Sequence, residues 1–423
     1  MTYPSPRRFR RLYEQILLSR PFSIAIGCLV AVILPCLAAW SKNELLTPDG
    51  NQKTTILVAT LAYLGSHLAN MHSRNMLPAI KPTIFMAPQT LLIYSLSAAV
   101  TLILNLEASL HVLMASGVLA ILWQYLEYTC THKHRRWKMA VIPGGRYTEE
   151  ILKSDFITPF SLERLELDRR YDGVVADFDR ADKNIEKFLA QCALNRTAVY
   201  DAKYIYEWLT GRTKINRMTE NNIGATLPSP GYERTKQIID ILIVVFSLPV
   251  VLPIGLITAL LIKLESPGPT IYTQTRIGQG NKPFTIYKFR SMRFDRDAPE
   301  QFAGENDPRI TRVGKIIRKL RIDELPQFLN ILKGEMSLIG PRPEQPSFVQ
   351  EYEQKLPFYN YRHIMKPGIS GWAQVRHGYT ASIDETQIKI EHDFYYIKHC
   401  SLALDLIVAI LTVRIMLTGF GAR

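Results

Sequence analysis

The sequence predicts a membrane protein in three parts: a bundle of membrane-spanning helices, a small α/β domain, and a third unit that begins with a helix entering the membrane. Three observations support this. Long charge-free apolar runs fill the first part of the chain, short alternating strand and helix patterns follow, and a proline-broken apolar run then precedes an arginine-rich segment. A chain of 423 residues has room for two or three domains. We place them at residues 1–136, 137–230 and 231–423.

Four apolar runs, at residues 22–40, 54–73, 83–106 and 108–126, are each long enough to cross a hydrocarbon core of about 30 Å. The second is the most polar, because it carries His67 and Asn70. Basic residues precede the first run, separate the second from the third and follow the fourth, so the positive-inside rule places both ends of the bundle in the cytoplasm. These residues are Arg7, Arg8, Arg10, Arg11, Arg20, Arg74, Lys81, Lys133, Arg135, Arg136 and Lys138. The first run is too long for a cleavable signal and other spans follow it.

The formal net charge of +13 fits nucleic acid, an anionic membrane surface or phosphorylated substrates. The grouping of apolar residues favours the membrane, and no nucleic-acid partner is expected. Five cysteines show neither CxxC nor Cys/His metal spacing. They are therefore expected to be reduced thiols without a disulfide framework.

The second part, residues 137–230, alternates strand and helix patterns. Apolar stretches at 139–142, 171–176 and 197–200 predict strands, and the spacing of apolar residues over 181–194 predicts a helix. This order indicates a small, truncated α/β domain of Rossmann-like type. Gly144 and Gly145 predict a tight turn rather than a nucleotide loop, because neither GxGxxG nor a Walker pattern is present. The linker near 219–231 is rich in Asn, Gly and Pro.

The third part begins with an apolar run at 237–262 that contains Pro249 and Pro253. Each proline removes an amide donor and clashes with the preceding turn, so a helix here kinks, and Ser247 can bond backbone carbonyls and help to accommodate the bend. Basic residues at both ends can anchor to headgroups of one leaflet, which favours a re-entrant helix. A kinked full crossing is the alternative. The last apolar run, 402–420, carries Asp405 and is expected to lie in the interface or to pack on the core.

Two adjacent carboxylates, Asp323 and Glu324, lie between Arg318 and Arg342. Side chains of neighbouring residues diverge on any regular element, so one carboxylate can attack while the other holds a metal or a proton. Guanidinium groups are planar partners for phosphate oxygens. The pattern therefore favours chemistry on a phosphorylated substrate, although an arbitrary Asp-Glu pair is more often part of a charged surface helix.

A candidate strand at 284–289 lies upstream of the acidic pair. Strand alternation puts Lys288 and Arg290 on one face, toward a possible phosphate. Either residue alone is more often a solvated surface charge.

Several motifs in the third part resemble those of the bacterial sugar transferase family, and they occur in that family's order. They are the run 234–263, Ser266-Pro-Gly-Pro269, Lys288-Phe-Arg-Ser-Met292, Asp323-Glu-Leu-Pro-Gln327, the segment from Met336 to Pro343, the segment from Lys366 to Gln374, and residues 393–396. The resemblance covers about residues 232–423. It implies an α+β monotopic phosphoglycosyl transferase domain with a re-entrant membrane helix at about 237–262, marked by Ser247 and Pro249. The helical bundle and α/β domain are similar to the larger members of the family.

The resemblance also implies a reaction. Such enzymes transfer a sugar-1-phosphate from a UDP-sugar to undecaprenyl phosphate and release UMP, a first membrane step of exopolysaccharide, O-antigen or capsule synthesis. By analogy Asp323 is the nucleophile that forms a covalent sugar-phosphate intermediate in a ping-pong mechanism. Glu324 helps to hold Mg²⁺, a hard cation that prefers carboxylate and phosphate oxygens. Arg318 and Arg342, with Lys288 and Arg290, match positions that bind phosphates.

Trp372, Arg376 and Tyr379 are further candidates for contact with the nucleotide or sugar, although a tryptophan at an apolar–polar boundary can equally be a membrane-interface residue. Arg321 departs from the family pattern and adds a charge near the acids. The residues Arg376-His377-Gly378 also differ from those found there in many members of the family, so the motifs do not specify the sugar.

The resemblance further implies a multi-pass protein of the bacterial inner membrane, with its catalytic domain on the cytoplasmic face, that forms a homodimer. Two other functions remain open. One is a membrane scaffold whose third part only docks partner enzymes. The other is a transferase with active residues among the membrane helices, although those runs hold few charges from which to build a site.

Overall fold

The computed structural model describes residue 16 and residues 19–40, 47–76, 83–214, 227–293, 307–356, 358–377 and 383–418. It divides into two compact units, Met1–Gly211 and Arg212–Arg423. The first unit contains the helical bundle and the α/β domain, and the second contains the motifs shared with sugar transferases. Each unit is described separately.

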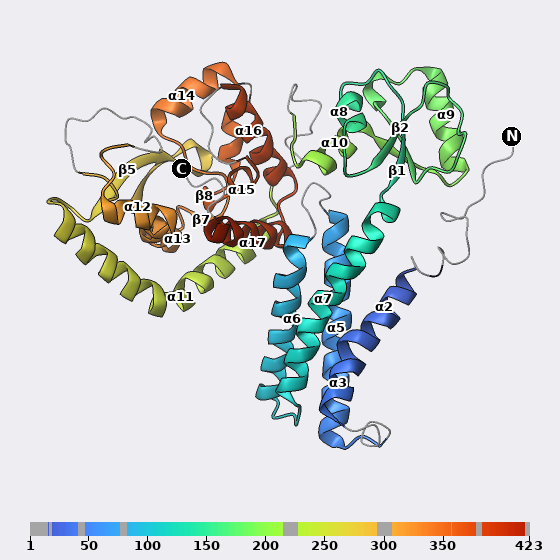
Figure 1. Ribbon diagram of the computed structural model, residues 1–423. Helices are drawn as coiled ribbons and strands as arrows, with labels where there is room; N and C mark the ends of the chain where they lie inside the picture. Colours follow the sequence, from blue (N-terminus) through green and yellow to red (C-terminus); the bar gives the residue numbers. More distant parts are fainter. Residues whose placement is uncertain are drawn as a thin grey trace. The chain divides into compact units, whose positions relative to one another are not determined.

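The bundle consists of α2 (Arg20–Cys28), continued by a π-helical turn and α3 (Leu34–Ala39), and of α5 (Gly50–Met76), α6 (Thr83–Ile103) and α7 (Leu110–Arg135) (Figure 1). Among the described helices of the bundle, the segments Arg20–Ala39, Thr83–Ile103 and Leu110–His132 are long and apolar enough to cross a membrane. Leucines such as Leu61, Leu92 and Leu122 are exposed on the outside. An apolar exterior is what a lipid environment requires, so the bundle is that of a membrane protein.

Helix α5 is more polar than the other helices of the bundle, and its polar side chains lie inside. Asn70 and Ser66 are buried and hydrogen-bond to Gln124 of α7, which also accepts a hydrogen bond from Thr90 of α6 at 2.9 Å. These residues hydrogen-bond to one another away from lipid, where an unpaired polar group is costly. The polar residues that weakened the second apolar run are therefore compatible with a helix at the centre of the bundle.

The α/β domain is built on a parallel sheet of order β2-β1-β3-β4. Its strands are β1 (Lys138–Val141), β2 (Thr158–Ser161), β3 (Gly173–Ala176) and β4 (Ala198–Asp201), and its helices are α8 (Thr148–Leu152), α9 (Lys183–Leu194) and α10 (Ala202–Thr210). Successive residues of β1 face opposite sides: Met139 and Val141 pack toward α10, and Ala140 packs toward α9. The predicted strands and helix are confirmed, and β2 was missed. Gly144 lies in a turn with φ +95°, a conformation that favours glycine.

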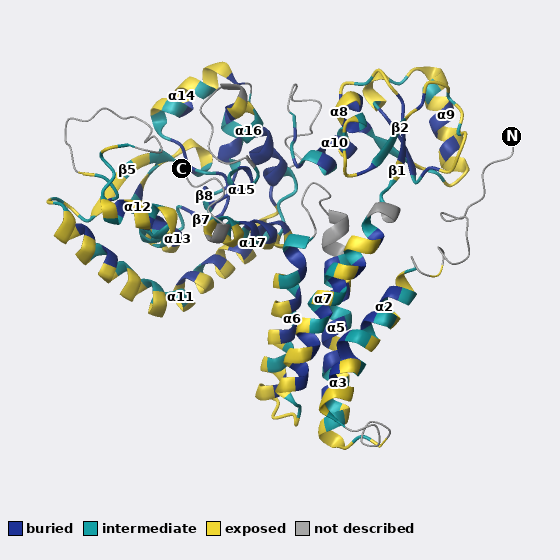
Figure 2. Ribbon diagram, viewed as in Figure 1, coloured by how far each residue is buried: buried dark blue, intermediate teal, exposed yellow. Residues whose placement is uncertain are grey.

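The second unit begins with α11 (Pro230–Glu265), one continuous helix that Figure 1 draws as two arms meeting at an angle. Pro249 and Pro253 lie inside it, and the Ser247 hydroxyl donates to the Val244 carbonyl at 2.8 Å. The bend agrees with the prolines, and Ser247 bonds a backbone carbonyl as expected. Most of the helix surface is exposed, with Phe246 at 79%, and α11 is long and apolar enough to cross a membrane (Figure 2).

Two short sheets follow α11. An antiparallel hairpin is formed by β5 (Ile271–Ile277) and β6 (Pro283–Phe289), and β7 (Ser337–Ile339) pairs in parallel with β8 (Gly368–Ser370). The helices of this unit are α12 (Arg312–Lys319), the 3₁₀ helix η6 (Ile322–Gln327), α13 (Phe328–Leu332), α14 (Pro346–Lys355), the 3₁₀ helix η7 (Tyr359–Ile364), α15 (Trp372–His377), α16 (Ile383–Lys398) and α17 (Leu402–Thr418). The mixture of segregated helices and small sheets is an α+β arrangement.

Helix α17 packs on the core of this unit, which was one of the two predicted alternatives. Leu404, Val408 and Leu411 are buried. Asp405, which interrupts the last apolar run, accepts hydrogen bonds from Tyr396 at 2.5 Å and from Lys236 of α11 at 2.9 Å. Asp405 therefore joins α17 to α11 through a buried ion pair with Lys236.

Candidate active site

The acidic pair lies on η6, directly after α12. The chain reverses at Arg321, which has φ +56°, and η6 then starts at Ile322. Ile322 and Leu325 pack against the buried side chains of Ile262 and Phe289. Because these two apolar residues are three positions apart, they fix one face of η6 and leave the two acids between them on the other side.

Glu324 is surrounded by cations. Its side chain is 6% exposed, and its Oε1 atom lies 3.0 Å from Arg342 Nη2 and 3.4 Å from Lys288 Nζ. Arg321 Nη1 lies 3.7 Å from the other carboxylate oxygen. Burial alone would raise the pKa of Glu324, but Arg342, Lys288 and Arg321 outweigh it and lower this pKa to about 2. Glu324 is therefore a permanent anion at neutral pH.

Asp323 has the opposite electrostatic character. Burial, followed by the charge of Glu324, raises its pKa to about 6, although the neighbouring cations oppose the change. Its Oδ1 atom is buried and has no hydrogen-bond partner among the described residues. A poorly solvated carboxylate oxygen without a partner is a more reactive nucleophile than one that is already hydrogen-bonded. The adjacent acids are thus suited to different tasks, as the sequence predicted.

Lys288 and Arg342 reach the pair from separate elements. Lys288 lies on β6, where it pairs with Tyr272 of β5, and β6 packs directly against η6. Arg342 follows β7 in a loop held very close to the start of β8: a Cβ atom on Gly340 would lie only 2.5 Å from the Lys366 carbonyl oxygen. Only glycine permits this approach, which explains its place in the Gly-Pro-Arg-Pro motif.

A buried ionic network that the sequence analysis missed supports the Arg342 loop. Arg362 donates to the Arg342 carbonyl oxygen at 2.8 Å and to Asp393 at 2.9 Å, and the side chains of Arg362 and Asp393 are each 2% exposed. Glu344 lies 2.6 Å from Lys389 and 3.7 Å from Arg276. The network holds the main chain on either side of Pro343. Residues 393–396 were singled out as a motif, but no spacing in the sequence links Asp393 to Arg362.

One of the proposed phosphate-binding residues is engaged elsewhere. The guanidinium of Arg290 is buried and donates to the carbonyl oxygens of Ser266 and Pro267, at 2.8 and 2.5 Å. The expectation that Arg290 faces a phosphate is therefore wrong in this conformation, because its charge fastens the turn after α11. Arg318 lies in the last turn of α12, and its contact with a substrate phosphate stays a prediction. The cation missed at the acidic pair is Arg321, which the sequence analysis left without a role.

Comparison with known proteins agrees with these motifs. The family model described as bacterial sugar transferase matches residues 231–419. The UDP-N-acetylgalactosamine-undecaprenyl-phosphate N-acetylgalactosaminephosphotransferase of Aeromonas hydrophila is 46% identical over 421 residues, which are 99% of this chain and 99% of that protein. The chain belongs to the bacterial sugar transferase family.

Other relatives match less than half of this sugar transferase. The UDP-glucose:undecaprenyl-phosphate glucose-1-phosphate transferase of Escherichia coli K12 is 40% identical over 190 residues, 44% of this chain and 41% of that protein. The putative undecaprenyl-phosphate N-acetylgalactosaminyl 1-phosphate transferase of Bacillus subtilis is 47% identical over 132 residues, 31% of this chain and 74% of that protein. The resemblance stated from the motifs is confirmed.

The proposed nucleotide and sugar contacts are less well supported in this sugar transferase. Trp372 has no exposed surface, and its ring stacks on Tyr395 with centroids 5.9 Å apart. Arg376 lies over the same ring, 5.5 Å from its centroid. The expectation that Trp372 stacks on a uracil or sugar is wrong in this conformation, because protein already covers its faces. Tyr379 lies outside the described residues.

Proposed function

We propose that the protein transfers a sugar-1-phosphate from a UDP-sugar to undecaprenyl phosphate and releases UMP. The observation that carries this proposal is the acidic pair: Asp323 has an unpartnered buried oxygen next to Glu324, which three cations surround. The names of the relatives support the same donor and acceptor classes. The product is the lipid-linked sugar that begins a surface polysaccharide, of exopolysaccharide, O-antigen or capsule type.

The reaction proceeds in two displacements. An Asp323 carboxylate oxygen attacks the sugar-bearing phosphorus, the bond from this phosphorus to the bridging oxygen breaks, and UMP leaves with the electron pair. This gives an acyl phosphate on Asp323. A phosphate oxygen of undecaprenyl phosphate then attacks the same phosphorus and displaces the carboxylate, which restores Asp323. Arg342, Lys288 and Arg321 neutralise charge that would otherwise repel an anionic nucleophile from a diphosphate.

The donor set of the site fits Mg²⁺ that is shared with the substrate. The described residues contain no cluster of three or more His, Cys, Asp or Glu side chains placed to hold a metal. Mg²⁺ is, however, commonly bound by one or two carboxylates together with substrate phosphates, and Glu324 and the free Oδ1 of Asp323 supply such oxygens. Bound there, Mg²⁺ would polarise the diphosphate and neutralise its charge.

We also propose a membrane arrangement for the two units. The first unit crosses the bacterial inner membrane with four helices, and α11 enters from the cytoplasmic side and returns, so that the catalytic domain remains cytoplasmic. The bend of α11 and its exposed apolar surface support this arrangement. Labelling of single cysteines at Arg234 and Lys263 tests it: both react with a membrane-impermeant reagent only from the cytoplasm if α11 returns, and from opposite sides if α11 crosses. The active form is a homodimer, as in similar large family members, which cross-linking in native membranes tests.

The decisive experiment uses purified full-length protein, undecaprenyl phosphate and a panel of UDP-sugars scored by UMP release. UDP-N-acetylgalactosamine is the first donor to test, because the relative that matches along the whole chain carries that sugar in its name, and UDP-glucose is the second. Wild-type protein incubated with donor but without acceptor should accumulate a sugar-phosphate adduct on Asp323, visible by mass spectrometry. Full turnover by Asp323→Asn would contradict the assigned nucleophile, and absence of UMP release with every donor would leave the scaffold function.

A further inference from the structure

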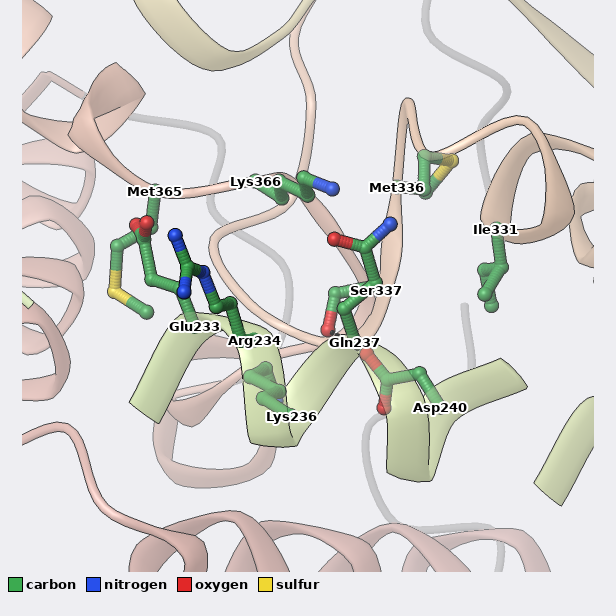
Figure 3. Close-up of a pocket in the computed structure, with 10 residues that line it drawn as sticks. All are labelled: Glu233, Arg234, Lys236, Gln237, Asp240, Ile331, Met336, Ser337, Met365 and Lys366. Atoms are coloured by element: carbon green, nitrogen blue, oxygen red, sulfur yellow. Dashed lines mark hydrogen bonds between the residues drawn. The ribbon is translucent and has the colours of Figure 1, made fainter. Parts of the chain in front are cut away.

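A cavity of about 130 Å³ lies in the second unit beside the first turns of α11. Its polar rim is formed by Glu233, Arg234, Gln237 and Lys366, and its wall includes Met336 and Met365. Figure 3 shows the three α11 side chains of the rim rising from the helix toward the segment that carries Lys366. None of the residues of the acidic pair or of its surrounding cations lines this cavity.

The rim presents hydrogen-bond donors that lack acceptors. Gln237 Nε2 and Lys366 Nζ lie 3.6 and 3.7 Å from the point that a Cβ atom on Gly334 would occupy. Among the described residues, no ion pair or hydrogen bond engages the side chains of Arg234, Gln237 or Lys366. The Lys366 ammonium and the Gln237 amide thus lie near one point, and Arg234 lines the same cavity, so the cavity offers donors of the kind that a phosphate group accepts.

The other charges of the cavity are already satisfied. Lys236 is paired with Asp405 at 2.9 Å, and Asp240 accepts from the Ser337 hydroxyl at 2.5 Å. These contacts fix the helix beneath the rim without using the donors above it. Glu233 is the one remaining carboxylate among the residues that line the cavity, and its charge opposes an anion.

The position of the cavity indicates what the anion is attached to. Directly after the rim, α11 presents exposed Ile238, Leu242 and Ile243, so polar side chains give way to lipid-facing ones within one turn. Such a boundary lies at the level of lipid headgroups. An amphiphile can therefore place its phosphate on the rim and its chains along the apolar face of the helix.

We propose that this cavity is a binding site for the phosphate headgroup of a membrane lipid, separate from the reacting centre. The active-site end of α11 packs through Ala259 and Ile262 against the residues that flank Asp323. At 1.5 Å per residue, roughly 28 Å of helix separates Asp240 from Ala259. A lipid bound at the rim holds the first arm of α11 at a defined depth while the second arm supports η6.

The test is native mass spectrometry of the full-length protein in detergent, titrated separately with phosphatidylglycerol, undecaprenyl phosphate and inorganic phosphate. The variants are Arg234→Gln and Lys366→Gln, and Lys355→Gln is the matched control, since it removes one exposed positive charge on α14 away from the rim. Loss of one charge-assisted hydrogen bond should weaken retention of the lipid roughly tenfold in either rim variant. The control should bind as wild type does, and Glu233→Gln should bind more tightly.

The outcomes separate the possible sources of the phosphate. Preferential retention of phosphatidylglycerol identifies a bulk phospholipid, and preferential retention of undecaprenyl phosphate identifies the acceptor lipid held outside the reacting centre. Both support a lipid-phosphate site. Equal retention by wild type and both rim variants overturns the proposal, and so does inorganic phosphate binding as tightly as either lipid. Loss of UMP release in Asp323→Asn is independent of all these results, so this site and the proposed reaction can fail separately.

Discussion

Replacing Asp323 by asparagine should stabilise the protein while abolishing its turnover. In the folded chain, burial and the neighbouring Glu324 raise the pKa of Asp323 from 3.8 to about 6. Each tenfold change in proton affinity is worth about 1.4 kcal/mol. The ionised form is therefore disfavoured by the fold by at most about 3 kcal/mol, a penalty that a neutral asparagine at this position would not carry.

The gain in stability from Asp323→Asn should depend on pH. The folded pKa of Asp323 is above the unfolded one, so at pH values below 3.8 the carboxyl is protonated in both states and the substitution changes nothing. As pH rises from 3.8 toward 6, the wild type alone loses stability, and above 6 the advantage of Asp323→Asn is complete. Thermal unfolding of the full-length protein in detergent with EDTA should show a midpoint several degrees above wild type at about pH 7.5, and nearly the same midpoint at about pH 4.

Glu324→Gln is the matched control, because the same chemical change one residue along should have the opposite effect. The pKa of Glu324 lies below its ordinary value, so its charge stabilises the fold above pH 4.5. Removing it leaves Arg342, Lys288 and Arg321 facing one another, which should cost roughly 3 kcal/mol at about pH 7.5. If both substitutions shift the midpoint in the same direction at this pH, the assignment of opposite electrostatic roles is wrong.

Three further outcomes are expected from UMP-release assays. The value of kcat/KM should rise as pH passes through about 6 and then level off, because Asp323 attacks as the carboxylate; a flat profile between about pH 5 and pH 8 would contradict this. Arg342→Lys should lower kcat at least roughly tenfold with an unchanged circular dichroism spectrum, since an ammonium keeps the charge but not the planar pair of donors. Arg362→Lys should lower kcat and leave the KM for the donor nearly unchanged, because it loosens the main chain that carries Arg342. Asp393→Asn should have the same effect, since Asp393 holds Arg362. Normal turnover in both variants would exclude a positioning role for this pair.

The architecture of the chain was largely predictable from local patterns. Long apolar runs predicted the bundle, and strand–helix alternation predicted most of the α/β domain. The strand β2 was missed because Thr158-Pro-Phe-Ser161 is short, polar and interrupted by proline, and its place at the edge of the sheet tolerates that composition. Pro249 and Pro253 predicted a bend in α11, since proline acts on its own turn and needs no information from distant residues.

The sequence predicted the parts of the candidate site whose residues are close together in the chain. Asp323 and Glu324 were found because they are adjacent and flanked by arginines. The same rule failed for Arg290, which was expected to face a phosphate with Lys288 but donates to the carbonyl oxygens of Ser266 and Pro267. A long flexible side chain can reach several partners from one backbone position. Its actual partner is decided by the tertiary fold.

The contrast between the two acids shows why this part of the site could not be read from the sequence. Asp323 and Glu324 are neighbours, and burial by itself would raise the pKa of each. What separates them is the approach of Lys288 from β6 and Arg342 from the loop after β7, both of which contact Glu324. Those contacts pair the carboxylate of Glu324 and leave Oδ1 of Asp323 without a partner. The β5–β6 hairpin and the Gly340 loop therefore give the two acids different roles, one as nucleophile and one as fixed anion.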